Sequence, residues 1–210
     1  MNLRRLGILT LALSLLPSCV DLSRTNPEKQ YYRLHVERAG PKGSKISDTR
    51  VHVSRFAVSP GFGTKELVYH KGRQEYESDF YNEWFLPPAI MVTQEIREWL
   101  NDSGIFETVV TPSSLVEPNY ILEGIVNSLY GDVEDRSQPK AILAMQTMLI
   151  RQTATNTSVV AQFDYRQEVA VEEYSQESLV AALNQALGKI LKQLETDLQA
   201  LRSELAVANP

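Results

Sequence analysis

The sequence predicts an α+β fold in which a mostly antiparallel sheet packs against two main helices, the C-terminal one long. Two observations lead to this fold class. Apolar and polar side chains alternate, or apolar side chains follow one another, in three segments that we predict to be strands: residues 119–130, 140–152 and 158–172. Turn-rich segments join these strands as antiparallel neighbours. Residues 87–104 and 176–205 carry apolar side chains at helical spacing. Long strands of this kind often project beyond a domain or pair with another subunit.

The first part of the chain adds shorter strands to this sheet. Alternation over Tyr31 to Val36 predicts the first strand, and residues 51–58 predict the second. Residues 66–70 and 75–81 are predicted to pair as a hairpin across a Lys-Gly-Arg-Gln turn. These strands extend the antiparallel arrangement.

A helix with clear end signals follows this hairpin. Pro87 and Pro88 suit its first turn, where backbone N–H groups have no helical partner. Gly104 suits the left-handed position that ends a helix. Residues 106–110 then predict a short strand.

The C-terminal helix carries a narrow leucine stripe. Its apolar positions step by three or four residues, close to a heptad seam. Two interpretations remain open: the first half of the helix packs on the chain's own sheet, and the second half, from Lys192 to Leu205, meets a partner helix. The stripe consists of Leu179, Leu183, Leu187, Ile190, Leu194, Leu198 and Leu201.

The first nineteen residues predict export. Arg4 and Arg5 precede an apolar run from Leu6 to Leu16, and the segment ends on Cys19, which is the single cysteine of the chain. The run is shorter than the roughly 20 residues that span a bilayer. The segment resembles a bacterial lipobox, in which the cysteine is acylated and the signal is cut before it. A plain secretory signal followed by an incidental thiol is the alternative.

This interpretation divides the chain into four parts. We expect a lipoprotein signal peptide at 1–18, a lipidated tether at 19–30, a single αβ domain at 31–205 and a frayed tail at 206–210. Without the signal, 19 Lys and Arg face 26 Asp and Glu, a formal charge of −7. Nucleic-acid binding depends on basic side chains that neutralise phosphates, so we expect none.

The sequence offers little that could support catalysis. His35, His52 and His70 lack metal-ligand spacing, and there is no nucleophile elbow or phosphate-binding loop. The acidic segment 132–135 lacks the ligand spacing of a known calcium site. We therefore expect a protein that is not an enzyme and that holds no metal and no cofactor besides the acyl chains on Cys19.

The central block carries a family resemblance. It combines Tyr32-Arg33-Leu34, the Leu-Val-Tyr-His-Lys of residues 67–71, an aromatic run ending in Trp84-Phe85-Leu86-Pro87-Pro88, a helix, and Ser103-Gly104 before the strand at 106–110. Over residues 30–175 this pattern resembles the ABC-type transport auxiliary lipoprotein family. Tyr69-His70 stands where members commonly have Tyr-Arg.

The resemblance implies a non-catalytic, lipid-anchored accessory subunit of an ABC transporter. Its implied partner is a mammalian-cell-entry type substrate-binding protein, in a system that moves phospholipid or other hydrophobic molecules between the inner and outer membranes. A homo-oligomeric ring is also implied. The alternatives are an outer-membrane assembly lipoprotein with a β-barrel partner, and a direct periplasmic lipid carrier.

Two expectations concern where the protein binds. Large rings load the junction between the hairpin and the helix, and any that stays exposed is a candidate docking anchor; Tyr81, Trp84 and Phe85 are the candidates. Val20, not Asp, directly follows Cys19. In enteric-type sorting this favours the periplasmic face of the outer membrane over the inner membrane.

Overall fold

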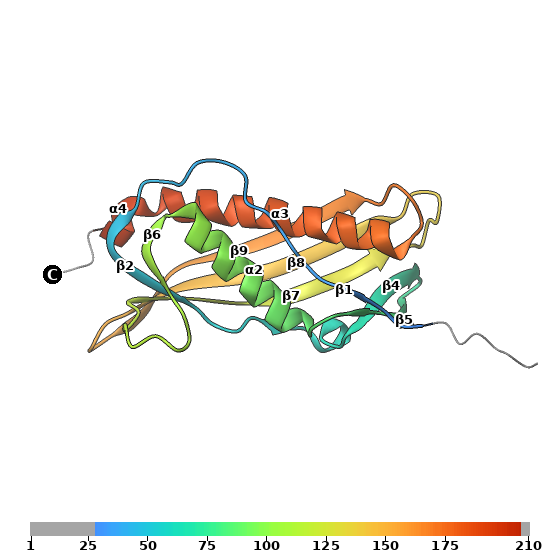
Figure 1. Ribbon diagram of the computed structural model, residues 1–210, viewed down its shortest axis with the longest axis horizontal. Coiled ribbons are helices and arrows are strands. Elements are labelled where there is room, and N and C mark those ends of the chain that lie inside the picture. The colour runs from blue at the N-terminus through green and yellow to red at the C-terminus, as the bar shows by residue number, and fades with distance from the viewer. Residues whose placement is uncertain (1–27, 207–210) are drawn as a thin grey trace, which may run out of the picture.

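The computed structural model describes residues 28–206, shown in Figure 1. The expected signal peptide, Cys19, most of the tether and residues 207–210 of the expected tail lie outside this range. The elements are β1 (Gln30–Tyr32), β2 (Ile46–Val53), β3 (Ala57–Val58), the 3₁₀ turn η2 (Pro60–Phe62), β4 (Glu66–Gly72), β5 (Glu75–Trp84), α2 (Pro88–Ser103), β6 (Phe106–Val110), β7 (Tyr120–Asp132), β8 (Lys140–Gln152), β9 (Thr157–Ala170), α3 (Gln176–Ala200) and α4 (Arg202–Ala206).

The described strands form one curled, mixed sheet, so the prediction of a mostly antiparallel sheet was wrong. Five pairings are parallel: β1–β5, β2–β6, β2–β7, β3–β7 and β4–β7. The antiparallel pairings are β4–β5, β7–β8 and β8–β9. Three α-helices accompany the sheet in this part of the chain, since the short α4 follows α2 and α3.

The sequence pattern could not predict strand direction, for a physical reason. Apolar side chains alternate in the same way whether a neighbouring strand runs parallel or antiparallel. Parallel neighbours need a long crossover, and here the segment containing β4, β5 and α2 connects β2 to β6. The three long strands were correctly predicted as antiparallel neighbours.

The first strand of the structure is shorter than the alternating pattern predicted. Only Gln30–Tyr32 pairs with β5; the following residues run beside α2 and α3 instead. The backbone N–H of His35 donates to the side chain of Asn184, at 3.0 Å, and that of Val36 donates to Glu95, at 2.8 Å. Side-chain acceptors on the two helices therefore replace strand partners here.

Both ends of α2 follow the predicted signals. Pro88 occupies the first turn, and Gly104 adopts the left-handed conformation at φ 65° directly after Ser103. The side of the helix that includes Val92, Ile96 and Leu100 is buried in the core. The prediction of this helix was confirmed.

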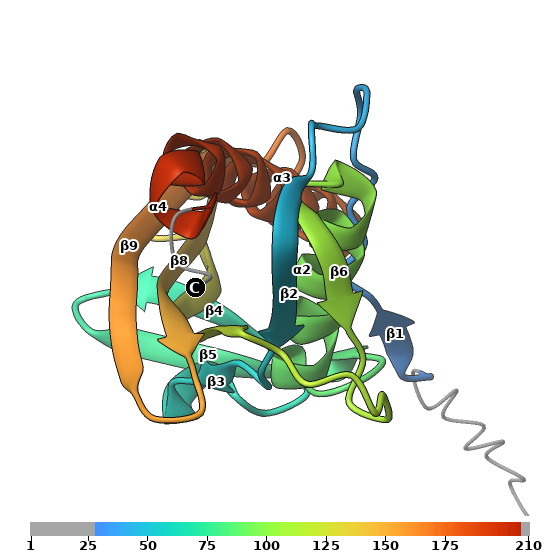
Figure 2. The same ribbon diagram turned by 90° about the vertical axis from the view of Figure 1, so that its left-hand side faces the viewer.

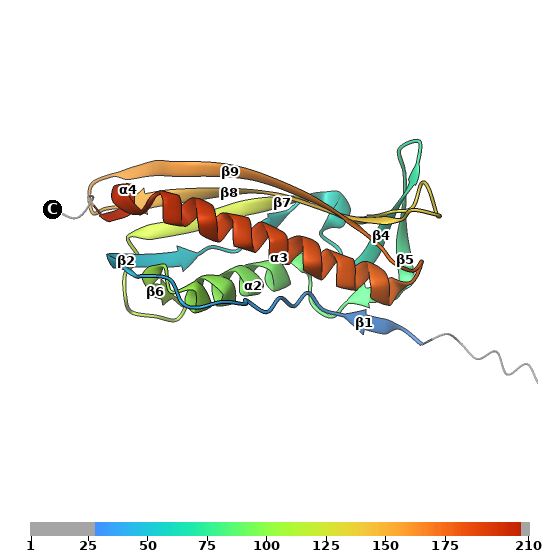
Figure 3. The ribbon, with the colours of Figure 1, turned by 90° about the horizontal axis from the view of Figure 1, so that it is seen from above.

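The C-terminal helix packs along the long axis of the domain, against β8, β9 and α2 (Figure 3). Its apolar stripe is buried within the chain itself except for the half-buried Leu201, and Leu194 and Leu198 in the distal half are both buried. This favours the first of the two interpretations, packing on the chain's own sheet. The helix also breaks at Leu201, after which α4 turns so that Leu205 is buried as well.

Figure 2 shows the sheet curled about the long axis, with β8 and β9 on one side, β2 and β6 on the other, and α3 crossing between them. The space between sheet and helices is filled by one apolar cluster that includes Phe56, Leu122, Leu149 and Ile190. Among residues 28–206, no helix combines the length and apolar character needed to cross a membrane.

Candidate functional site

The end of the domain where β1 pairs with β5 collects the aromatic side chains that the sequence singled out. Tyr31 lies opposite Glu83 and Tyr32 opposite Trp84 in this parallel pair. The backbone N–H of Phe85 then donates to the carbonyl of Tyr32, at 2.6 Å, which holds the start of the β5–α2 junction against β1. The short helix α4 lies at the opposite end of the molecule (Figure 3).

An irregularity in β5 shapes this end. Val68 pairs with Ser78 and Glu66 pairs with Glu83, so β5 has extra residues between these pairs. Asp79 holds the extra loop: its Oδ1 accepts the backbone N–H groups of Tyr81 and Asn82, at 3.0 and 3.1 Å, and its Oδ2 accepts the Asn82 amide, at 2.9 Å. The bulge breaks the alternation of the strand and turns neighbouring rings toward solvent.

The predicted docking residues do not share one environment. Tyr81 is 43% exposed and Phe85 is 61% exposed, but Trp84 between strand and helix is only 2% exposed and belongs to the core. A ring that is buried in this way cannot contact a partner directly. Cys19 lies outside the described residues.

Two further rings at this end are exposed, although neither was among the three named docking candidates. Phe80 is 66% exposed and packs edge-on against Tyr81, with ring centroids 5.1 Å apart, and Tyr31 is 54% exposed. We call Tyr31, Phe80, Tyr81 and Phe85 the aromatic end. The one available signal was Asp79, because aspartate favours turns that accept N–H groups two residues later.

The ammonium groups of two lysines lie over two of these rings. The ammonium of Lys29 lies 4.6 Å from the centroid of Phe80, and that of Lys65 lies 5.4 Å from the centroid of Tyr31. Lys29 also pairs with Glu83, and the hydrogen bond between them raises the pKa of Lys29. The aromatic end thus presents rings beside ammonium groups.

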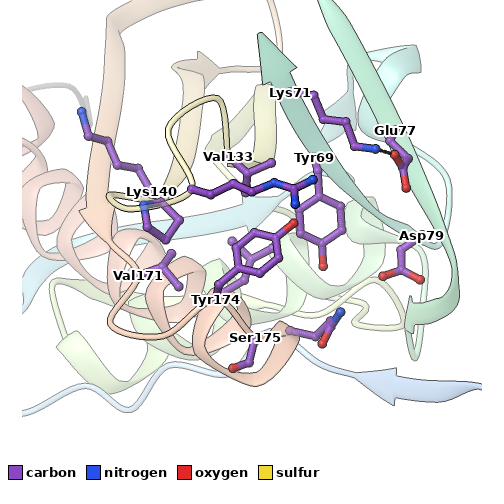
Figure 4. A pocket seen from close by; sticks show the side chains of 14 residues that line it. Tyr69, Lys71, Glu77, Asp79, Val133, Lys140, Val171, Tyr174 and Ser175 are labelled. Carbon is purple, nitrogen blue, oxygen red and sulfur yellow. Dashed lines mark ion pairs between the residues drawn. The ribbon is translucent and has the colours of Figure 1, made fainter.

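A separate pocket of about 210 Å³ lies where α3 begins (Figure 4). Its walls come from β4, β5, the β7–β8 connection and the segment between β9 and α3. The guanidinium of Arg136 stacks over Tyr174, 5.6 Å from the ring centroid. Other lining residues are Tyr69, Lys71, Glu77, Asp79, Val133, Lys140, Val171, Ser175, Gln176 and Leu179.

Some polar groups of this pocket have partners. Lys71 pairs with Glu77, and the hydroxyl of Ser175 accepts the backbone N–H of Ser178 as the cap of α3. Burial raises the pKa of the Tyr69 phenol above its ordinary value. The volume is below the ~300–1,000 Å³ of typical small-molecule sites. The pocket could hold a small polar molecule.

A third cluster joins a histidine and two carboxylates. Ligand atoms of His70, Asp132 and Glu134 lie within 4.8 Å of one another, and His70 Nδ1 is 3.3 Å from Asp132 Oδ1. The ring of His70 also contacts Tyr76 and Tyr130. These three donors are one fewer than a structural zinc site uses, and Asp132 already accepts the backbone N–H of Glu134. The sequence placed His70 and the acidic segment apart; the β4–β7 pairing brings them together.

Comparison with known proteins gives a family and a fold. The sequence profile of a family described as ABC-type transport auxiliary lipoprotein component matches residues 32–195. A crystal structure of a Xanthomonas campestris protein assigned to DUF330 matches with a TM-score of 0.68 at 17% identity, covering 83% of this chain and 98% of that one. A crystal structure described as an uncharacterized protein gives 0.64 at 13%, covering 81% and 99%. At such identities these structures show the fold alone. No curated protein matches significantly.

Proposed function

The chain belongs to the family of ABC-type transport auxiliary lipoprotein components, and from this premise we propose that it is the lipid-anchored, non-catalytic subunit of one particular kind of ABC system. That system contains a mammalian-cell-entry type substrate-binding protein and moves phospholipid or other hydrophobic molecules between the inner and outer membranes. The subunit ties this conduit to a membrane. The observation that carries the proposal is the family match over residues 32–195.

The anchor in this proposal is Cys19. It is the single cysteine of the chain and follows a basic and then apolar segment. Each buried acyl CH₂ adds about 0.8 kcal/mol of membrane affinity, so the several acyl chains of a lipidated N-terminal cysteine hold a protein firmly. We propose the periplasmic face of the outer membrane, because Val20 follows Cys19.

A scaffold fits the described cavities better than a lipid carrier does. A carrier has to enclose acyl chains in an apolar cavity. The pocket at the start of α3 has about 210 Å³ and is lined by several charged side chains. A larger hollow of about 470 Å³ beside α3 is lined by Glu37, Arg38, Lys189, Lys192 and Glu195 among others. Neither resembles an apolar tunnel.

Self-association is part of the proposal. The outer edge of β9, fourteen residues long, has no neighbouring strand among the described residues. An unpaired edge is a template for strand addition, so a different edge of a second copy could extend the sheet there, and this contact repeated head to tail builds a ring. The mass of the purified protein in solution, measured by light scattering, tests this part.

Crosslinking in the native envelope tests the function. The full-length protein is purified after mild lysine crosslinking, and its partners are identified by mass spectrometry. The proposal expects a mammalian-cell-entry type protein together with the ATPase or permease. A β-barrel without transporter components supports the assembly-factor alternative. Bound phospholipid released from protein in the soluble fraction supports the carrier. Recovery of none of these components contradicts the proposed function.

A further inference from the structure

We propose that the aromatic end, formed by Tyr31, Phe80, Tyr81 and Phe85, rests on the phospholipid bilayer that holds the anchor. The inference deepens the proposed function and relies on acylation of Cys19. Its first support is the exposure of four large rings at one end of the domain. Exposed apolar rings gathered in one place indicate an interaction surface.

The bulge in β5 shows that this exposure is built into the fold. Asp79 uses both carboxylate oxygens to hold the loop that carries Phe80 and Tyr81. A regular strand would direct these two neighbouring rings to opposite faces of the sheet. The bulge turns both rings outward while Trp84, three residues after Tyr81, stays in the core.

The position of the anchor indicates that the aromatic end contacts the bilayer. Eight residues separate Cys19 from Glu28, where the described chain begins, and even a fully extended chain of this length reaches only about 30 Å. The chain enters the domain at β1, so Tyr31 comes three residues after Glu28. An acylated Cys19 therefore keeps the aromatic end, more than any other part of the domain, close to the membrane surface. The opposite end carries α4 and the β8–β9 turn (Figure 1).

The chemistry of the aromatic end fits the headgroup region. Tyrosine and lysine combine an apolar body with a polar tip, and both concentrate at membrane–water boundaries. Lys65 lies over the ring of Tyr31, where it can face lipid phosphates, whereas Lys29, over the ring of Phe80, is paired with Glu83. Glu66 and Glu83 lie at the same end, and the chain without its signal has a formal charge of −7. Because acidic and basic side chains occur together at this end of an acidic chain, we expect it to bind a zwitterionic bilayer surface. Anionic lipid should not strengthen this binding.

Site-specific fluorescence tests the contact. The mature lipidated protein is prepared with a single added cysteine, Y81C or F85C, and placed on vesicles of phosphatidylcholine and phosphatidylethanolamine. Because the one natural cysteine is acylated, a thiol-reactive, polarity-sensitive dye labels only the added residue. V159C is the matched control: Val159 is apolar, 58% exposed, and lies on β9 near the β8–β9 turn at the far end.

The inference expects a blue shift and several-fold stronger quenching by headgroup-labelled lipid at positions 81 and 85 than at 159. It also expects little change when anionic lipid is added. Protein that floats with vesicles while the dyes at 81, 85 and 159 behave alike overturns the inference and leaves the anchor intact. A blue shift of the same size at 81 and 85 in unlipidated C19S protein, without vesicles or detergent, points to a second copy or protein partner and also overturns it. Protein that does not float overturns both the anchor and this inference.

Discussion

Arg38 and Glu195 form a two-bonded ion pair although 157 positions separate them in the chain. Nε and Nη2 of Arg38 donate to the two carboxylate oxygens of Glu195, each at 2.8 Å. The indole N–H of Trp99 donates to the same carboxylate, also at 2.8 Å. Arg38 further donates to the carbonyls of Gly40 and Pro41. One carboxylate on α3 thereby holds α2 and the segment that follows β1.

Removing Arg38 should destabilise the protein strongly. Both side chains of the pair are largely buried, so R38A leaves Glu195 with an uncompensated charge; we expect a loss of about 3 kcal/mol in the free energy of unfolding. Urea unfolding of R38A, E195Q and the double variant measures the coupling. The control is R166A: Arg166 pairs with Glu168 on the surface, and its loss should cost less than about 1 kcal/mol. Equal effects of R38A and R166A would contradict a special role for the buried pair.

The same ion pair should make the free energy of unfolding depend on pH in the acidic range. The hydrogen bond from Arg38 holds the pKa of Glu195 below its ordinary value of 4.5. The unfolded chain therefore binds this proton more readily than the folded one, and the contribution to stability is complete above pH 4.5 and lost as pH falls through the folded pKa. We expect the difference in unfolding free energy between wild type and R38A to narrow from pH 7 to pH 3. A constant difference across that range would rule out this linkage.

Gly124 should tolerate no side chain. A Cβ at this position would lie 2.2 Å from the carbonyl oxygen of Gln146 and 2.5 Å from Cε1 of Phe56, so β8 or the core would have to move. We expect G124A to lose at least about 3 kcal/mol, the upper end for overpacked cores. G61A is the control, because nothing lies within 4 Å of a Cβ there. Thermal unfolding measures the stability of both variants. A small effect of G124A would show that β7 and β8 can move apart at little cost in free energy.

The leucine stripe of α3 should matter for folding of the single chain. Leu194 is fully buried, so L194A should cost about 2–5 kcal/mol through lost contacts and the cavity left behind. Leu115 is fully exposed, and L115A should change stability by no more than about 0.5 kcal/mol. Chemical unfolding at several protein concentrations is the measurement. A loss of self-association without a loss of stability in L194A would favour the partner-helix interpretation instead.

Asp79 should control the shape of the aromatic end. D79A removes the acceptor for the backbone N–H groups of Tyr81 and Asn82 and should lower the local opening free energy by about 1–2 kcal/mol. Amide hydrogen exchange at these two residues should therefore speed up. D79N keeps an oxygen that can accept and should preserve most of the protection. Equal protection in D79A and wild type would mean that the bulge does not depend on this carboxylate.

Much of the local structure was predictable from neighbouring residues. The β4–β5 hairpin, the strand at 106–110 and the three long strands all appear where alternation and turns placed them. Pro88 and Gly104 marked the ends of α2, because a ring without an N–H and a residue free to adopt positive φ act on the backbone where they stand. The family resemblance also rested on sequence alone and was confirmed.

Other features depend on residues that meet only in the folded chain. Alternation does not record strand direction, so β2, β3 and β4 turned out to run parallel to β7. Tyr81, Trp84 and Phe85 are all aromatic, yet the bulge held by Asp79 and the packing of the core left two exposed and buried the third. Propensity and capping act within a few residues, whereas burial and pairing are set by the free energy of the whole chain. That is why short-range elements can be read from sequence while the surface that meets a partner needs the three-dimensional structure.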